Sequence, residues 1–374
     1  MSSRSDRRRK LILLGLALLA LSFQAALELT RKPVRQRDYE LKLEAARRAE
    51  LAFSAVRRHR LMEGAVLDLV NDPAGTGLIG PEFSLITNAQ GVLGAKLTTL
   101  NPNWAGVIVG YLRRCGLKPG DPVAVALSGS FPGLNISVFA ALETLELSPV
   151  VVSSVGASMW GATDPDFTWL DMERLFAEEN IFHITSAAAS YGGGDDMGQG
   201  LSPEGRERLR TAVERNGVRL LESQNIEEAI TKRMTFYVEA LRGRRAKAFI
   251  NVGGGVASLG TSRNKVLLPE GLSFDLGQHN YPRKGVMVLM AERGIPVIHL
   301  LNMESLAREV GLPVAPDYHP QPGEGEIFVR ESYRLSLAAP LLVLYCAICV
   351  LVLAPELRRG LFDRWSGRMD GDSV

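Results

Sequence analysis

The sequence predicts an α/β domain with a mostly parallel sheet and flanking helices, anchored to a membrane by one transmembrane helix near each end of the chain. Two observations indicate this. Short runs rich in Val, Ala and Ile alternate with longer helical patterns, which is typical of strand–helix units and a parallel sheet. Two apolar blocks, 11–29 and 335–354, have the length that an α-helix needs to cross a bilayer. About 300 residues lie between them, enough for one large domain or two small ones.

These two blocks define the expected organisation. It comprises a cytoplasmic basic tail (1–10), a first transmembrane helix (11–29), an amphipathic connector helix (30–75), an extracytoplasmic α/β domain (76–326), a second transmembrane helix (335–354) and a cytoplasmic tail (355–374). Both tails are basic, and Lys and Arg are enriched on cytoplasmic flanks. We therefore expect a two-pass protein of the cell (plasma or inner) membrane with both termini in the cytoplasm. Basic residues at 31–37 oppose this orientation, but long domains translocate largely regardless of charge. A cleaved signal peptide is the alternative for the first block.

Apolar runs and helical spacing predict the elements of the domain. Runs bounded by Gly, Pro or polar residues predict strands at 83–87, 122–127, 149–153, 181–185, 218–221, 246–252 and 297–301. Apolar residues three to four positions apart predict helices at 38–70, 102–115, 135–147, 171–179, 202–216, 226–241 and 303–310. Ser202 and Pro203 supply an N-cap and a first-turn proline, and Asn216-Gly217 supplies a stop.

The first candidate site follows the strand at 122–127, because ligands in open α/β sheets bind beyond the carboxyl ends of strands. Here Ser128, Gly129 and Ser130 lead into the predicted helix that carries Asn135. Small residues let a ligand approach the backbone, and a helix start offers free N–H groups to a carboxylate or phosphate. Ser130 is alternatively a nucleophile, although the G-x-S-x-G pattern is absent, or the N-cap of the helix.

The second candidate site follows the strand at 246–252 in the same way. Its predicted ligand-binding residues are Asn251, Gly253, Gly254, Gly255 and Ser258. The segment departs from the G-x-G-x-x-G and P-loop patterns, which gives little support to nucleotide binding. Arg263 and Lys265 come shortly afterwards and would suit an acidic ligand. A solvated basic loop is the alternative for these two.

Two further features carry side chains capable of chemistry. Asp195 and Asp196 lie in a glycine-rich loop and could hold Mg²⁺ or Ca²⁺ through carboxylate oxygens, unless they are simply solvated. His279 has an ordinary pKa near neutrality and is a candidate general base for Ser130. Its alternative is a place in a polar turn.

The composition argues against several classes of protein. The net charge of +2 carries no nucleic-acid signature, so no nucleic-acid partner is expected. Cys115 is alone in the predicted domain, which excludes a disulfide framework there. The five histidines lack the close paired spacing of common zinc sites, and no motif identifies a cofactor.

Four segments, taken with the two membrane helices, resemble a known bacterial family. They are 77–80, 124–135, 156–162 and 249–255. The pattern covers most of the chain and is similar to the poly-gamma-glutamate system protein family. The resemblance implies an accessory membrane protein of poly-γ-glutamate synthesis or export, a process that belongs to capsule formation. It also implies synthase membrane components as partners and the anionic polymer as ligand, with no catalytic residues assigned.

Two other classes of function stay open beside this resemblance. One is an extracytoplasmic serine-type hydrolase or transferase that uses Ser130 and His279. The other is a purely structural subunit that holds membrane partners through its two helices.

Overall fold

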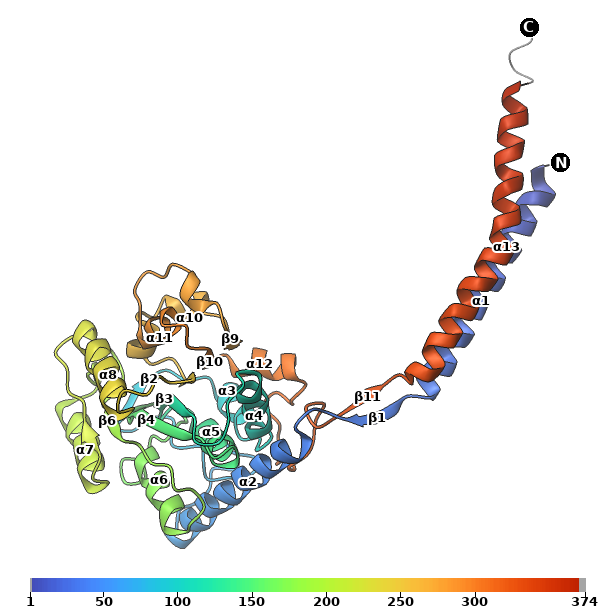
Figure 1. Ribbon diagram of the computed structural model, residues 1–374. Coiled ribbons are helices and arrows are strands. Elements are labelled where there is room, and N and C mark those ends of the chain that lie inside the picture. The colour runs from blue at the N-terminus through green and yellow to red at the C-terminus, as the bar shows by residue number, and fades with distance from the viewer. Residues whose placement is uncertain (1, 370–374) are drawn as a thin grey trace. The chain divides into compact units, whose positions relative to one another are not determined.

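The computed structural model describes residues 2–369, which divide into two units (Figure 1). The terminal unit contains the segments before Gln36 and after Phe328, and the globular unit is Gln36–Phe328. Parts of the two predicted tails, residue 1 and residues 370–374, lie outside the described residues.

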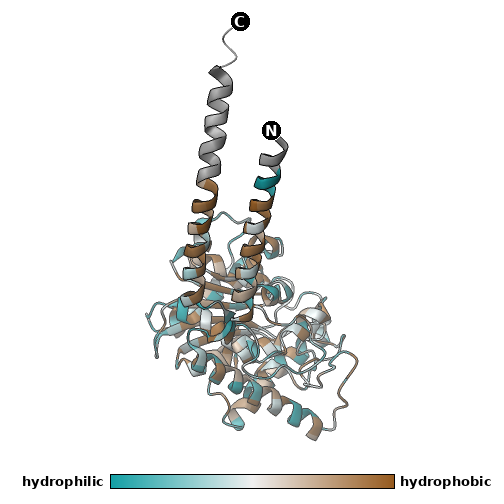
Figure 2. Cartoon of the chain, turned by 90° about the vertical axis from the view of Figure 1, so that its right-hand side faces the viewer, coloured by the Kyte–Doolittle hydropathy of each residue, from teal (hydrophilic) through white to brown (hydrophobic). Residues whose placement is uncertain are grey.

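The terminal unit consists of two long helices and two short strands. They are α1 (Ser2–Leu29), β1 (Lys32–Arg35), β11 (Val329–Ser332) and α13 (Leu335–Met369). The two strands pair antiparallel, and between the helices the rings of Phe23 and Tyr345 meet edge to face with centroids 6.4 Å apart. Arg7–Leu29 and Leu335–Ala354 are long and apolar enough to cross a membrane, by length and composition (Figure 2).

The globular unit is built on a mainly parallel sheet, which has seven strands within 36–328. In spatial order they are β7 (Arg219–Leu220), β6 (Ala188–Ser190), β4 (Ser148–Ser154), β3 (Pro122–Ser128), β8 (Ala248–Val252), β10 (Val297–Leu300) and β9 (Gly271–Ser273). Neighbours run parallel except β10 and β9, which are antiparallel. A separate parallel pair is formed by β2 (Thr87–Ala89) and β5 (Ala157–Ser158).

Both faces of the sheet are covered by helices. Successive side chains of a strand point to opposite faces, so Val125 and Leu127 of β3 join one core while Ala124 and Ala126 join the other. The first core is covered by α2 (Tyr39–Met62), α4 (Trp104–Arg114), α5 (Pro132–Thr144), α6 (Trp169–Glu178), α7 (Pro203–Arg215) and α12 (Met303–Val310). The second is covered by α8 (Ile226–Ala240), α9 (Val256–Leu259), the 3₁₀ turn Leu276–Gln278 and α11 (Val286–Glu292).

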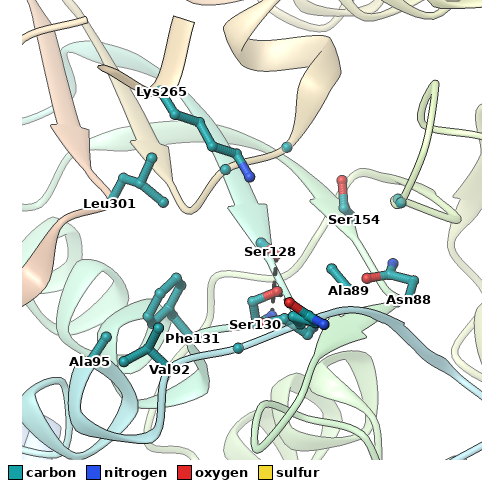
Figure 3. Close-up of a pocket in the computed structure, with 18 of the residues that line it drawn as sticks. Asn88, Ala89, Val92, Ala95, Ser128, Ser130, Phe131, Ser154, Lys265 and Leu301 are labelled. Atoms are coloured by element: carbon teal, nitrogen blue, oxygen red, sulfur yellow. Dashed lines mark hydrogen bonds between the residues drawn. The ribbon is translucent and has the colours of Figure 1, made fainter. Parts of the chain in front are cut away.

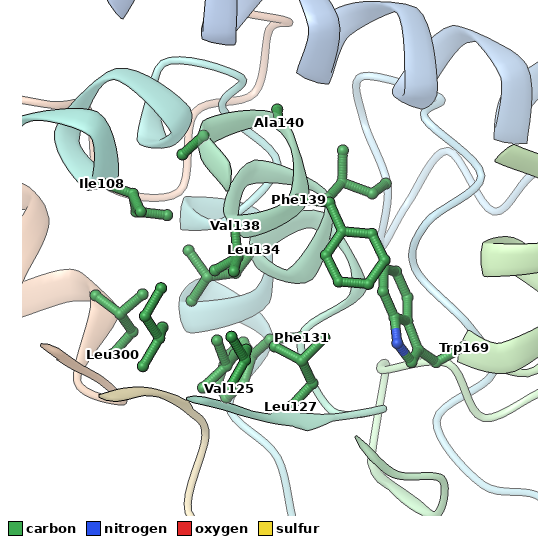
Figure 4. Close-up of a cluster of buried hydrophobic side chains, with 14 of the residues drawn as sticks. Ile108, Val125, Leu127, Phe131, Leu134, Val138, Phe139, Ala140, Trp169 and Leu300 are labelled. Atoms are coloured by element: carbon green, nitrogen blue, oxygen red, sulfur yellow. The ribbon is translucent and has the colours of Figure 1, made fainter. Parts of the chain in front are cut away.

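The first core is the larger one, and Figure 4 shows its centre. Leu134 and Val138 of α5 lie over Val125 and Leu127 of β3, and Phe139 packs edge to face on Trp169 at 5.4 Å between ring centroids. β3 is buried along its whole length, as expected for a strand covered on both faces. The structure therefore confirms the mixed α/β class and the mainly parallel sheet.

Several predicted boundaries are wrong. Residues 83–86 and 181–185 are not in strands, and only Thr87 of the first predicted run belongs to one, β2; the apolar side chains Ile86 and Phe182 are buried from loops instead. The helix expected at 135–147 begins three residues earlier, with Pro132 in its first turn. The helix expected at 38–70 ends at Met62 and packs against α4 and α5, so it belongs to the globular unit.

Candidate functional site

A cavity of about 570 Å³ lies where the strand order of the sheet reverses. From β3 the chain moves outward through β4, β6 and β7, and then returns to add β8 and β10 on the other side of β3. The carboxyl ends of β3 and β8 at such a switch point form the crevice in which open α/β sheets bind ligands. The polar side chains lining the cavity include Asn88, Lys96, Ser128, Ser130, Ser154, Ser158, Lys265, Asn302 and Glu304.

The two segments that the sequence singled out meet at this cavity. Gly253 has a left-handed backbone with φ +86°, and a Cβ there would lie 3.1 Å from the Cβ of Ser128. Since β3 and β8 are neighbouring parallel strands, their ends bring Ser128 and Ser130 opposite Gly254 and Gly255, and all four line the cavity. The segments are more than 120 positions apart in the sequence, yet their adjacency follows from the strand order.

The first segment forms a tight turn. The Ser130 N–H donates to Ser128 Oγ at 3.2 Å, and Asn135 Nδ2 donates to the Ser128 carbonyl at 2.9 Å. Gly129 is required because a Cβ there would lie 2.5 Å from the carbonyl oxygen of Val155. Asn135 and Gly129 therefore shape the turn without lining the cavity, and the N-cap of α5 is Phe131 rather than Ser130.

The second segment places a cation beside glycine backbone. Lys265 is exposed, lies on the short helix α10 (Asn264–Leu267) and lines the cavity; its Cε would be 3.0 Å from a Cβ at Gly254. Figure 3 shows its side chain reaching toward the strand end that carries Ser128. Arg263, two residues earlier, is also exposed but is not part of the lining.

Lys96 was not among the predicted site residues, and it is the buried cation of the cavity. It lies on the short helix α3 (Leu93–Thr98) and is only 2 % exposed. Its Nζ donates to the Ser130 carbonyl and, at 2.7 Å, to Ser158 Oγ. Burial lowers the pKa of Lys96 to about 7. The available signal was its isolation, because Lys96 is the only charged residue between Glu82 and Arg113.

A buried ion pair supports the cavity wall at Ser154. Arg233 donates to both carboxylate oxygens of Asp196, at 2.8 and 3.0 Å, and to Ser154 Oγ at 2.9 Å. Asp196 is therefore committed to Arg233, while its neighbour Asp195 accepts from Gln199 at 3.1 Å. The two aspartates do not form a shared oxygen site, and the described residues contain no group of three or more His, Cys, Asp or Glu suited to a metal.

Three other predicted residues lie away from the cavity lining. Asn251 is buried, and its Nδ2 donates to the Gly253 carbonyl at 2.8 Å and lies 3.0 Å from Nδ1 of His299. Its side chain is therefore hydrogen-bonded within the protein interior. Ser258 is buried in α9. His279 is exposed after the 3₁₀ turn and does not line the cavity that contains Ser130, so the structure does not bring this proposed base and nucleophile together.

Comparison with models of known protein families, with curated proteins and with solved structures finds no match for this chain. Any function must therefore be argued from the cavity and from the two terminal helices. The cavity offers hydroxyl groups, glycine backbone and two lysines against one glutamate, a set that favours an anionic ligand with hydrogen-bonding groups.

Proposed function

We propose that this protein is a two-pass membrane protein whose globular unit lies outside the cytoplasm and binds poly-γ-glutamate during its synthesis or export. The polymer repeats one amide and one free carboxylate per residue. In the cavity, Lys265 is a partner for a carboxylate, and the serine hydroxyls and the half-buried glycine backbone are partners for an amide. The resemblance noted in the sequence points to the same polymer.

The observation that carries the proposal is the charge of the cavity. Lys265 forms no ion pair with a carboxylate among the described residues, and the one acid of the lining, Glu304, pairs with Arg308 at 3.6 Å. Positive charge without a protein counter-ion attracts anions, and a site with small residues lets the backbone of a chain approach closely.

The two terminal helices supply the setting. Each is long and apolar enough to cross a bilayer. Basic residues precede the first apolar block and follow the second one in the sequence. Two crossings would hold the globular unit at the membrane surface where a polymer emerges. Synthase membrane components would then contact the helices, since polymer export requires a membrane complex.

Titration of the purified full chain with γ-glutamyl oligomers tests the proposal. We expect saturable binding that weakens with salt, because exposed charge pairs are screened. Lys265→Met should weaken binding about tenfold, equivalent to about 1.4 kcal/mol for one charge-assisted contact.

Arg263→Met is the matched control, since Arg263 is also exposed, lies two residues away and does not line the cavity. It removes the same charge from the protein, so it should leave the affinity within about twofold. Equal losses in both variants would show that the oligomers respond to overall charge, and absence of saturable binding would remove the proposal.

A further inference from the structure

Ser158 and Lys96 meet at the cavity wall although 62 residues separate them in the sequence. β5 carries Ser158 and is held by its parallel pairing with β2, in which Ser158 is opposite Ala89. The Ser158 N–H donates to Ser130 Oγ at 3.0 Å. The Ser158 hydroxyl is thereby fixed beside Lys96 Nζ, and the residue lines the cavity.

The surroundings of Lys96 favour its neutral form more than is usual for a lysine. Its pKa falls to about 7 because the ammonium is removed from water. The Phe131 ring, 4.0 Å from Nζ, opposes this by favouring the cation. The other charged side chains of the lining, Lys265 from α10 and Glu304 from α12, form no ion pair with it. A carboxylate partner, which would keep Lys96 protonated, is missing from its described contacts.

We infer that Ser158 is a nucleophile and Lys96 its general base, acting on an amide or ester bond of a chain held in the cavity. This inference rests on the proposed function, because the bound polymer would supply the bond. A serine hydroxyl becomes a nucleophile when an adjacent base accepts its proton, and lysine serves as that base in serine–lysine pairs.

The step balances without any further reagent. Ser158 Oγ attacks the carbonyl carbon while its proton passes to neutral Lys96 Nζ. The bond from that carbon to nitrogen or oxygen then breaks, and the proton on Nζ goes to the leaving amine or alcohol. Water, or the amine of a second chain, attacks the Ser158 ester and gives its proton to Nζ. The bond from the carbonyl carbon to Ser158 Oγ then breaks, and Nζ passes that proton to Oγ, which restores the hydroxyl and the neutral lysine.

Labelling the full chain with phenylmethanesulfonyl fluoride, followed by peptide mass spectrometry, tests this pair. We expect one adduct on Ser158 that does not form when the protein is unfolded. The labelling rate should rise with pH through about 7, as Lys96 loses its proton. An adduct on Ser130 or Lys96, or no adduct on the wild-type protein, would overturn the inference.

Variants of the two residues separate base catalysis from simple charge. Lys96→Arg keeps the positive charge but cannot be deprotonated, so labelling should slow by about 100-fold or more. Ser158→Ala should abolish the adduct. Ser262→Ala, an exposed serine outside the lining, should change neither the site nor the rate. If Lys96→Arg labels as fast as the wild-type protein, Lys96 is not the base, whatever the stability of the variant.

The binding titration distinguishes failure of this inference from failure of the proposed function. Oligomers that bind to a wild-type protein whose Ser158 cannot be labelled would remove the catalytic pair and leave the binding site. Labelling of Ser158 in a protein that does not bind γ-glutamyl oligomers would remove the polymer and the proposed substrate together. Shortening or transfer of γ-glutamyl oligomers that is lost in Ser158→Ala would support both.

Discussion

Asp195 and Asp196 are neighbours in the chain, but their carboxylates lie in different environments. Asp196 is buried against Arg233, while Asp195 is partly exposed and accepts a hydrogen bond from Gln199. Asp196→Asn should destabilise the protein by about 3–5 kcal/mol, because it leaves the buried Arg233 charge uncompensated. Asp195→Asn should stay within about 0.5 kcal/mol.

Urea unfolding of the two variants measures this contrast. The Asp195 variant is a close control, because both positions have positive φ, which asparagine tolerates as well as aspartate. If the two variants lose the same stability, Asp196 is not the partner that neutralises Arg233.

Glu173 is a second buried acid, and its environment sets a pH dependence. Its carboxylate oxygens accept from the Ser186 N–H and hydroxyl, each at 2.7 Å, while burial raises the pKa of Glu173 to about 7. The folded state therefore holds a proton that the unfolded chain releases near 4.5. Stability from this residue is full at low pH and falls as pH rises from about 4.5 to 7, by up to about 3 kcal/mol.

Glu173→Gln should remove this slope, because the amide does not titrate. Urea unfolding at about pH 5 and about pH 8 should show the variant gaining stability relative to the wild-type protein at the higher pH. A parallel pH dependence for the two proteins would mean that burial does not hold the Glu173 proton.

At the scale of elements, α2 shows how a helix expected to be a connector becomes part of the core. Its small buried residues, Ala45, Ala49 and Ala52, let it approach α4 and α5 closely. Ala49→Leu should destabilise the globular unit by about 1–3 kcal/mol through overpacking.

Leu51 on the same helix provides the control, since it is 60 % exposed. Leu51→Ala should change the free energy of unfolding by less than about 0.5 kcal/mol. Chemical denaturation measures both variants. A tolerated leucine at position 49 would indicate that α2 packs loosely and that the globular unit begins after it.

The elements that the sequence predicted well have strong local signals. β3 and β4 contain the valine-rich runs Val123–Leu127 and Val150–Val152, which are typical of buried strands, and α7 has a Ser202 cap whose side chain accepts from the Gly205 N–H. β6 was missed because Ala188–Ser190 is only three residues long and contains no β-branched or aromatic residue, so its pairing with β4 defines it. Such a strand is specified by its tertiary contacts rather than by its local sequence.

The candidate site divides in the same way. The sequence placed Ser128, Ser130, Gly254 and Gly255 at strand ends, which share one edge of a parallel sheet, and all four line the cavity; whether they bind a ligand stays a prediction. Asn251 was assigned to the ligand, but sequence alone does not reveal that His299 lies opposite it on the adjacent strand β10. Lys96 and Ser158 were missed because their contact joins a six-residue helix to a two-residue strand, neither of which has a periodic pattern.

At the scale of the whole molecule, the proposed setting can be tested apart from the site. Alkaline phosphatase and green fluorescent protein fusions at Gly200, an exposed position, report the side of the membrane on which the globular unit lies. Two crossings with both termini in the cytoplasm predict an active phosphatase and a dark fluorescent protein at this position, and the reverse near the chain ends.

A fluorescent fusion at position 200 with an inactive phosphatase would place the globular unit in the cytoplasm. The cavity and its chemistry would be unchanged by that result. The globular unit would then have to bind the polymer before its export, and partners on the outer surface of the membrane would be excluded.

The measurement that bears most directly on the proposed function is an experimental structure of the full chain with a bound γ-glutamyl oligomer. We predict density for the oligomer between Ser130 and Gly254–Gly255, with one carboxylate about 3 Å from Lys265 Nζ and an amide carbonyl beside Ser158. An empty cavity at a saturating oligomer concentration, or an oligomer seated on another surface of the globular unit, would contradict the proposal.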